Sequence, residues 1–421
     1  MLSLVVKAGT AARELLIAWY FGTSDPLDAY LIAYAVPYFF ITLLGASLAP
    51  VLVPAYVGLR VRHQRKGAER LVGDVILVST LLLIVVAVVL AAGAPLYLRL
   101  IAVGFSPEKL ALAEGLAAVL APTVLTSVLV SLAGGILNAH NRFVAPALSP
   151  LISTSVVVGA LFVFSTRSGV FALAFGLLAG TAIELVVLAA LVRREVAPRF
   201  SLALANPHLL DLGARFVPTL IGAVLMASTL LVDQAMSSAL PAGSIAALNY
   251  ANRLVTPPLG LTAAALGTVV LPHFSEMVSS ERWSELSSTI GRYLWKAALV
   301  TIPLGLGLFL LASPLTELLL HRGAFSGADV TTVASCLAAL ALQIPFYTGV
   351  ILLMRLALAL KLNAAIAVIS CASLVLDVGM NAWLASFMGV TGIALATSIV
   401  YACSFGLLLA VTQRRLQHTA A

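Results

Sequence analysis

Apolar segments long enough to cross a lipid bilayer recur along the whole of this 421-residue chain. A transmembrane helix needs roughly 20 consecutive, mostly apolar residues, and stretches such as 81–92 are apolar without interruption. The strands of a membrane β-barrel would instead alternate polar and apolar residues, so this pattern indicates helices. Composition agrees, because 61% of the residues are hydrophobic and only 10% are charged. The sequence therefore predicts an all-α polytopic membrane protein with about twelve transmembrane helices.

The predicted helices divide into two similar halves. The longest polar interruption, 193–215, separates an N-terminal lobe of six helices, 1–192, from a C-terminal lobe of six helices, 216–421. The second helix of each half is long and contains proline, and the two align at an offset of 218 residues, which pairs Pro54 with Pro272. Duplicated halves are typical of transporters that alternate their access. We therefore expect two pseudo-symmetric lobes around a central cavity, joined by a cytoplasmic linker.

Basic residues are distributed unevenly between the two sides of the predicted bundle. Seventeen of the 24 Lys and Arg residues fall in alternate connections and the C-terminal segment, whereas four fall in the opposite connections. Because positive charge is retained on the cytoplasmic side, both termini are predicted to lie in the cytoplasm. The basic run within 60–70 is then an anchor beside anionic membrane lipids, and a nucleic-acid interface is not expected.

The sequence shows no pattern of a catalytic or metal site. The three cysteines lie in apolar segments without metal or redox spacing, and the six histidines are scattered near helix ends. A glycine-rich phosphate loop of the ATPase type is also missing from the sequence. We therefore expect a protein that is not an enzyme and has no metal or cofactor, with the membrane potential or an ion gradient as its driving force.

Three cations lie inside segments that are otherwise apolar: Lys7, Arg13 and Arg253. A charge at mid-helix costs roughly 2.5–3.5 kcal/mol on insertion scales, so the fold or the function must offset it. One interpretation is an anionic ligand, because a guanidinium donates paired hydrogen bonds to phosphate oxygens and stays charged. The alternative is a structural ion pair with a carboxylate such as Glu14 or Asp233.

A set of short motifs is spread over residues 1 to about 330. These motifs are Arg13-Glu14, Phe21-Gly22, Asp28-Ala29, Pro37, Val53-Pro54, Leu137-Asn138, Asn141-Arg142-Phe143, Tyr250-Ala251-Asn252-Arg253-Leu254, Leu271-Pro272 and Gly323. Their residues and spacing resemble those of the MviN/MurJ family of lipid II flippases. That family belongs to the superfamily of multidrug, oligosaccharide-lipid and polysaccharide exporters.

The resemblance implies a flippase of the bacterial inner membrane. Such a protein moves a polyprenyl-diphosphate-linked sugar, with lipid II of peptidoglycan preferred, from the cytoplasmic to the outer leaflet by alternating access. The resemblance assigns Arg13 and Arg253, together with Lys7, to binding of the diphosphate in the cavity. It assigns Asp28 and Glu14 to gating or coupling. The implied partners are the lipid-linked glycan, membrane lipids and enzymes of cell-wall or polysaccharide synthesis.

The chain also departs from the family at several positions. Family members usually carry an arginine and then a Glu-Gly pair on helix two, where 41–47 reads ITLLGAS here, and a glutamate where Thr256 stands. Most members also have further helices that help to bind the prenyl tail. These departures keep three alternatives open: a flippase for a lipid-linked exopolysaccharide or other surface-glycan unit, a cation-coupled multidrug exporter, and a transport-dead scaffold.

Overall fold

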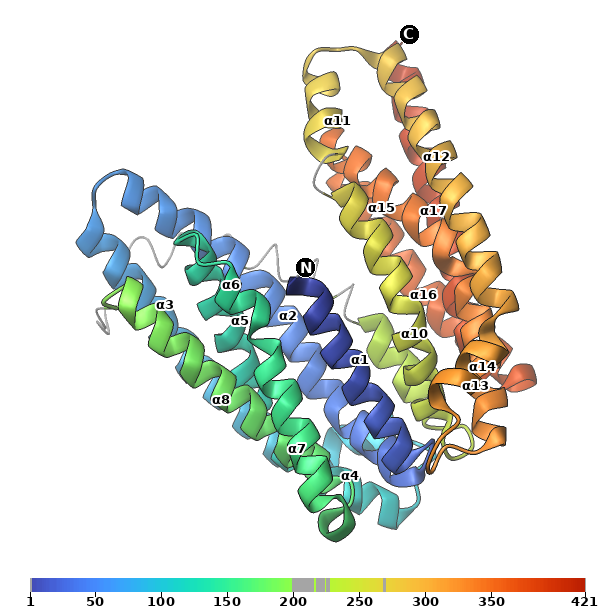
Figure 1. The fold of residues 1–421 in the computed structure, drawn as a ribbon. Helices are drawn as coiled ribbons and strands as arrows, with labels where there is room; N and C mark the ends of the chain where they lie inside the picture. The colour runs from blue at the N-terminus through green and yellow to red at the C-terminus, as the bar shows by residue number, and fades with distance from the viewer. Residues whose placement is uncertain (1, 199–215, 217–223, 225–227, 268–269, 421) are drawn as a thin grey trace. The chain divides into compact units, whose positions relative to one another are not determined.

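The chain folds almost entirely into α-helices (Figure 1). The computed structural model describes residues 2–198, 216, 224, 228–267 and 270–420. Within these residues no β-strand occurs. The all-α fold class predicted from the sequence is confirmed.

The helices form two compact units, Met1–Ala239 and Leu240–Ala421. The segment 228–239, which belongs to the first helix expected in 216–421, groups with the first unit. Most of the predicted linker, 193–215, lies outside the described residues, so its bounds and those of the two lobes stay a prediction.

Unit 1 is built from long helices packed along one another. Its helices are α1 (Leu2–Phe21), α2 (Asp25–Val61), α3 (Arg65–Ile101), α4 (Pro107–Leu120), α5 (Thr123–Ala139), α6 (Val144–Leu148), α7 (Pro150–Ser168) and α8 (Phe171–Glu195). α7 and α8 run side by side, and α2 packs against α3, α4 and α5 (Figure 1). α1 packs instead against α6 and α7. The first two helices of the chain therefore have largely different neighbours.

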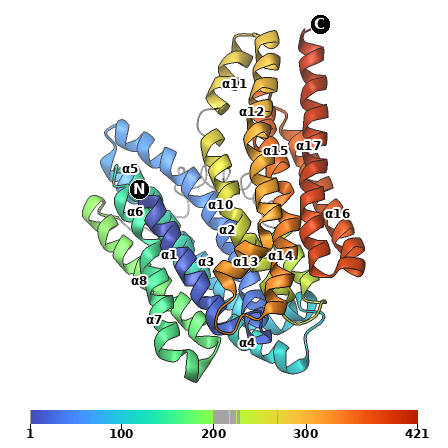
Figure 2. The ribbon, with the colours of Figure 1, turned by 45° about the vertical axis from the view of Figure 1, so that its right-hand side comes forward.

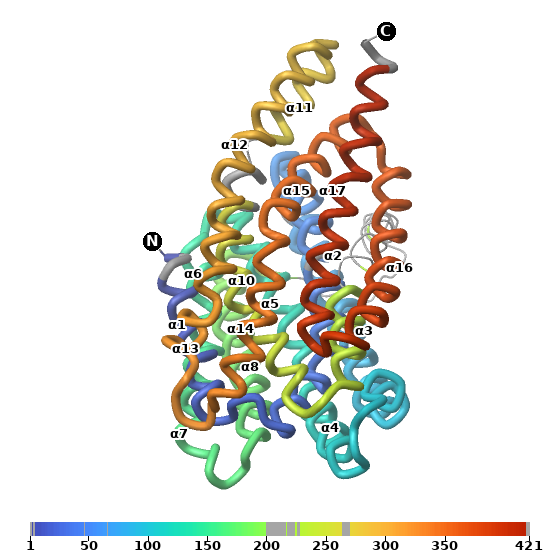
Figure 3. Tube along the Cα trace, turned by 90° about the vertical axis from the view of Figure 1, so that its right-hand side faces the viewer, coloured from blue at the N-terminus to red at the C-terminus, as the bar shows by residue number. Residues whose placement is uncertain are grey.

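Unit 2 has a similar succession of helices. They are α10 (Ser244–Gly267), α11 (Val270–Ser279), α12 (Trp283–Leu310), α13 (Ala312–Leu320), α14 (Gly327–Ala341), α15 (Gln343–Ala359), α16 (Asn363–Met388) and α17 (Val390–Ala420). α16 and α17 pack side by side (Figure 2), and α17 also contacts α14 and α15 (Figure 3). A cluster that includes Phe274, Met277, Leu286 and Leu353 forms a buried core in this unit.

Nine helical segments among the described residues are long and apolar enough to cross a membrane. The remaining three of the twelve expected helices are α1 and α10, which contain the intramembrane cations, and the first helix expected in 216–421, which is described only in part. α1 and α10 are thus less apolar than the nine segments, and they are the helices to which the sequence assigns the binding of a ligand.

The helix connections repeat from one unit to the other. His63 (φ 58°) and Glu281 (φ 55°) are each followed by a residue whose N–H donates to the carbonyl oxygen five residues earlier. Asn141 (φ 59°) and Lys361 (φ 58°) are followed by the same hydrogen bond at another connection. This hydrogen bond is common at the C-terminal ends of helices, because it satisfies a carbonyl group of the last turn. Its recurrence at offsets of 218 and 220 residues supports the predicted internal duplication.

Small residues let α7 and α8 approach closely, and this contact can be tested at Gly180. A Cβ atom on Gly180 would lie 2.8 Å from the Cα and 2.9 Å from the carbonyl oxygen of Ser153, both backbone atoms of α7. We expect Gly180→Ala to lower the free energy of unfolding by about 1–3 kcal/mol, because the helices must move apart. The measurement is thermal unfolding of the purified protein in detergent.

Gly159→Ala is the matched control for this prediction. Gly159 also lies on α7, but a Cβ atom there meets nothing within 4 Å. Equal melting temperatures for the two variants would contradict the proposed close contact.

A polar cluster around His140 ties α2, α5 and α8 together. The His140 Nε2 atom is 2.6 Å from the Tyr56 hydroxyl, and its Nδ1 atom is 3.7 Å from the Glu195 carboxylate. Arg142 Nε donates to the same carboxylate at 2.8 Å. Burial, followed by the nearby Arg60, lowers the pKa of His140 below 6.5, although Glu195 opposes this shift. His140 is therefore neutral at pH 7 and shares a hydrogen bond with Tyr56.

This lowered pKa predicts that stability falls in mild acid. The unfolded chain takes up a proton at His140 more readily than the folded chain does, so the contribution of this residue is complete above about pH 6.5 and is lost at lower pH. We expect the melting temperature to fall between pH 7.5 and pH 5.5, and His140→Gln to reduce that fall. An unchanged pH dependence in the variant would show that His140 does not contribute.

Candidate functional site

Arg13 lies on α1 and pairs with the neighbouring Glu14. Its Nε and Nη2 atoms both donate to Glu14 Oε1, at 3.1 and 2.7 Å. The two side chains are only 19% and 12% exposed, so the pair is largely shielded from solvent. The interaction uses two of the five N–H donors of the guanidinium. The ion pair that the sequence suggested as an alternative is therefore present, and binding of a diphosphate by Arg13 stays a prediction.

Lys7 does not take part in this pair. It lies six residues before Arg13 on α1 and is exposed. At 3.6 residues per turn, a separation of six residues places the two side chains about 120° apart around the helix. The structure thus brings Arg13 and Glu14 together and leaves Lys7 on another face of α1.

Arg253 lies on α10 in unit 2, on an exposed part of the helix. The helix is held one turn earlier by Tyr250, whose ring meets the ring of Phe325 edge to face at 5.6 Å. Because Arg13 and Arg253 belong to different units, their joint action on one ligand is a proposal that we take up below.

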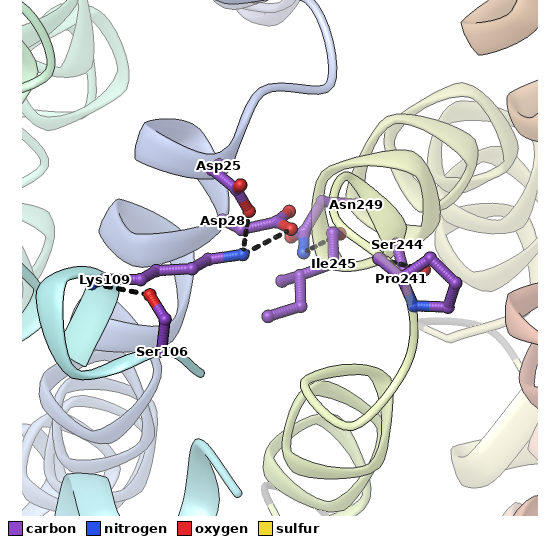
Figure 4. Close-up of polar contacts among 8 residues, drawn as sticks. All are labelled: Asp25, Asp28, Ser106, Lys109, Pro241, Ser244, Ile245 and Asn249. Atoms are coloured by element: carbon purple, nitrogen blue, oxygen red, sulfur yellow. Dashed lines mark hydrogen bonds and ion pairs between the residues drawn. The ribbon is translucent and has the colours of Figure 1, made fainter. Parts of the chain in front are cut away.

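Local hydrogen bonds shape the first turns of α10. The Ser244 hydroxyl donates to the Pro241 carbonyl oxygen at 2.7 Å, and the Asn249 amide nitrogen donates to the Ile245 carbonyl oxygen at 2.9 Å (Figure 4). These bonds satisfy the two side chains locally, at the start of the helix that contains Arg253.

Asp28 is buried on α2 and forms an ion pair with Lys109 of α4. Lys109 Nζ lies 3.2 Å from Asp28 Oδ2, and Lys109 also pairs with Asp25 (Figure 4). Asp28 is 1% exposed, and Lys109 Nζ lies 4.2 Å from the centre of the Phe105 ring. Asp28, which the resemblance assigns to gating or coupling, is therefore paired with a positive charge from another helix of unit 1. The sequence did not indicate this partner, because 81 residues separate the two side chains.

Asp377 of α16 is a second buried acid that bears on function. It is fully buried, and neither of its carboxylate oxygens has a hydrogen-bond partner among the described residues. Asn381 lies one turn later and is also fully buried. A charged carboxylate in such surroundings is costly unless it takes up a proton or a cation. Asp377 is thus a candidate for coupling to an ion gradient.

Comparison with known sequences gives the family. The chain matches the family described as Lipid II flippase MurJ over residues 17–421. This chain belongs to the MurJ family. A MurJ relative described as a probable lipid II flippase in Synechocystis is 28% identical, over 98% of this chain and 80% of the relative. A lipid II flippase MurJ of Burkholderia cenocepacia is 30% identical, over 84% of this chain and 70% of the relative.

Solved structures agree with the MurJ assignment. A lipid II flippase MurJ in an inward closed conformation is 25% identical and has a TM-score of 0.83, over 98% of this chain and 86% of that chain. An inward-facing multidrug transporter of the MATE family has a TM-score of 0.81 at 14% identity, which shows a common fold alone. The predicted family and the two-lobed membrane architecture are confirmed.

The ion pair of Asp28 with Lys109 can be tested by removing the lysine charge. We expect Lys109→Gln to lower the free energy of unfolding by about 3 kcal/mol, because it leaves a buried carboxylate without its cation. Asp28→Asn/Lys109→Gln is expected to recover part of this loss, since neither charge remains. The measurement is chemical or thermal unfolding of the four members of this double-mutant cycle.

Asp25→Asn is the control for this cycle. Asp25 pairs with the same lysine, but its side chain is 57% exposed. Exposed pairs contribute at most about 1 kcal/mol, so this variant is expected to stay close to the unmodified protein. A loss as large as that of Lys109→Gln would contradict the importance of the buried pair.

Proposed function

We propose that this protein is a lipid II flippase of the bacterial inner membrane. It moves lipid II, a sugar precursor linked to a polyprenyl diphosphate, from the cytoplasmic to the outer leaflet, with both termini of the chain in the cytoplasm. The observation that carries the proposal is the match to the MurJ family over residues 17–421, together with the similarity to a solved MurJ structure over 98% of the chain. The arginines in α1 and α10 provide the chemistry for an anionic head group.

Arg13 is suited to binding the diphosphate. Its guanidinium stays charged in an apolar region and presents a planar set of donors that matches phosphate oxygens. In the structure it is held by Glu14 at 2.7 Å, so a carboxylate occupies the place that a phosphate oxygen takes in the proposed complex. Binding then exchanges one anion for another, and Arg13 keeps a countercharge throughout.

Arg253 of unit 2 is the second arginine that we assign to binding of the diphosphate. A ligand that contacts Arg13 of unit 1 and Arg253 of unit 2 would link its binding to a movement of one unit against the other. Alternating access by such a movement is general among transporters with duplicated halves. Lys7 of α1 carries its positive charge on a flexible side chain, and we assign this residue to the initial attraction of the anionic head group.

The energy for transport comes from the membrane potential in this proposal. Moving a negative charge out of a cell with a negative interior releases about 2.3 kcal/mol per charge per 100 mV. Asp28, paired with Lys109, would respond to rearrangement of α2 against α4 and so act in gating. An ion gradient acting through Asp377 is the second source of energy that the structure favours.

The central prediction concerns the two arginines. We expect the unmodified chain to restore growth to a bacterium depleted of its own lipid II flippase, and Arg13→Ala and Arg253→Ala to fail at matched membrane levels. Loss of one charge-assisted hydrogen-bonding group costs about 1.5–3 kcal/mol, which corresponds to roughly 10- to 100-fold in transport. Growth rate and accumulation of lipid II are the measurements.

Arg322→Ala is the matched control, because Arg322 is an exposed cation between α13 and α14. Full growth with the Arg13→Ala/Arg253→Ala double variant would contradict the role of the two arginines in transport. No growth with the unmodified, correctly inserted chain would instead favour a flippase for a lipid-linked exopolysaccharide or other surface glycan.

A further inference from the structure

Three tyrosines form a ladder along one face of α2. The rings of Tyr30 and Tyr34 are stacked, with centres 6.2 Å apart and planes inclined by 17°. The rings of Tyr34 and Tyr38 follow at 5.7 Å and 51°. Residues four apart lie on the same side of an α-helix, so the three rings form a continuous strip. At 1.5 Å per residue the strip is about 12 Å long.

This tyrosine ladder is not part of the buried core of unit 1. Tyr30 and Tyr34 are half-buried, and Tyr38 is 42% exposed. The core-facing side of α2 is formed by other residues, such as the fully buried Ile32 and Ala33. The ladder also extends into the helix by more than three turns from Asp25, so it is not an aromatic belt confined to the end of a membrane span.

Arg13 lies within electrostatic range of this ladder. Its guanidinium interacts electrostatically with Tyr30 and Tyr34. α1 and α2 are joined by a turn of three residues, 22–24, so Arg13 is at the level of the first two tyrosines while Tyr38 lies one turn further along α2. Unit 1 thus places a cation at one part of the strip and polar aromatic rings along the rest of it.

We propose that Tyr30, Tyr34 and Tyr38 form the subsite for the sugars of the lipid-linked head group. This inference rests on the proposed function and adds the part of the substrate next to the diphosphate. Sugar rings have apolar C–H faces that pack on aromatic rings, and their hydroxyl groups exchange hydrogen bonds with phenols, which both donate and accept. A strip about 12 Å long has room for two sugar rings.

The order of the groups along unit 1 matches the order of groups in the substrate class. In a polyprenyl-diphosphate-linked sugar, the diphosphate is bonded directly to the first sugar. Arg13 likewise lies within electrostatic range of Tyr30 and Tyr34, the first two rings of the ladder. A cationic drug would be repelled by Arg13, and a simple anionic phospholipid would gain little from three phenol rings. The combination therefore favours an anion that carries a sugar.

The test compares two lipids that differ in their sugars. The full chain in lipid nanodiscs is titrated with undecaprenyl diphosphate, which has no sugar, and with lipid II. We expect Tyr34→Ala and Tyr38→Ala to weaken binding of lipid II about tenfold or more and to leave binding of undecaprenyl diphosphate within about twofold. Arg13→Ala is expected to weaken binding of both lipids. Tyr38→Phe keeps the ring and is expected to lose less affinity than Tyr38→Ala.

Phe39→Ala provides a matched control, because Phe39 is the neighbouring aromatic residue and its ring contacts Phe40 rather than the ladder. It is expected to change binding of neither lipid. Thermal unfolding of every variant separates loss of binding from loss of folding.

The outcomes distinguish this inference from the proposed function. Equal losses for the two lipids, or no loss in the tyrosine variants, would overturn the sugar subsite while binding of lipid II by the unmodified protein still supports the flippase. Failure of the unmodified protein to bind either lipid would overturn the proposed function, and the sugar subsite with it. Selective loss for lipid II in the tyrosine variants, with no effect of Arg13→Ala, would support the ladder and reject the role of Arg13.

Discussion

The ion pair between Arg13 and Glu14 is the interaction on which this account depends. An uncompensated charge within a membrane span costs about 2.5–3.5 kcal/mol, and α1 contains several charged residues within 20 residues. The 2.7 Å contact between the two side chains lies within α1 and offsets part of this cost. Because the partner is the next residue in the chain, the pair can separate without disturbing the packing of α1 against α6 and α7. A local and exchangeable partner suits a cation that has to accept a passing phosphate.

Two other buried acids, Asp28 and Asp377, differ in how the cost of burying their charge is offset. Asp28 of α2 takes its countercharge from Lys109 of α4, so the pair joins two helices and depends on their arrangement. Asp377 of α16 has no hydrogen-bond partner for its carboxylate within the described residues. The first arrangement is expected of a group that senses helix movement, and the second of a group that takes up a proton or cation. Both fit a transporter in which charge and conformation are linked.

The helical fold was predictable from the sequence because a backbone in lipid must satisfy its own hydrogen bonds, and the length of the apolar segments alone indicates this requirement. The positions at which the spans break were not predictable in the same way. The apolar segment 110–137, which is long enough for one membrane span, is divided between two helices, α4 and α5, which meet at Pro122, a residue that cannot donate a backbone hydrogen bond. The corresponding span of unit 2 also divides, between α14 and α15, just before Pro345. Proline was visible in both segments, but its effect depends on the neighbours that accept or replace the lost bond.

The site was predictable only in part, for a related physical reason. Arg13 and Arg253 could be singled out because a charge in an apolar segment is a local signal, and their role in binding stays a prediction. The partner of Asp28 was not, because Lys109 is distant in the chain and looked like an ordinary loop cation. The tyrosine ladder has a visible spacing of four residues, yet only the ring geometry and the nearby Arg13 distinguish it from tyrosines at a membrane surface.

The most direct test of the central claim is whether a diphosphate competes with Glu14 for Arg13. The measurement is the affinity of the full chain for undecaprenyl diphosphate in the unmodified protein, Glu14→Gln, Arg13→Gln and the double variant. If the anions exchange at Arg13, Glu14→Gln will bind this lipid more tightly, and the gain will vanish when Arg13 is also replaced. Weaker binding by Glu14→Gln, or the same effect with and without Arg13, would contradict the account.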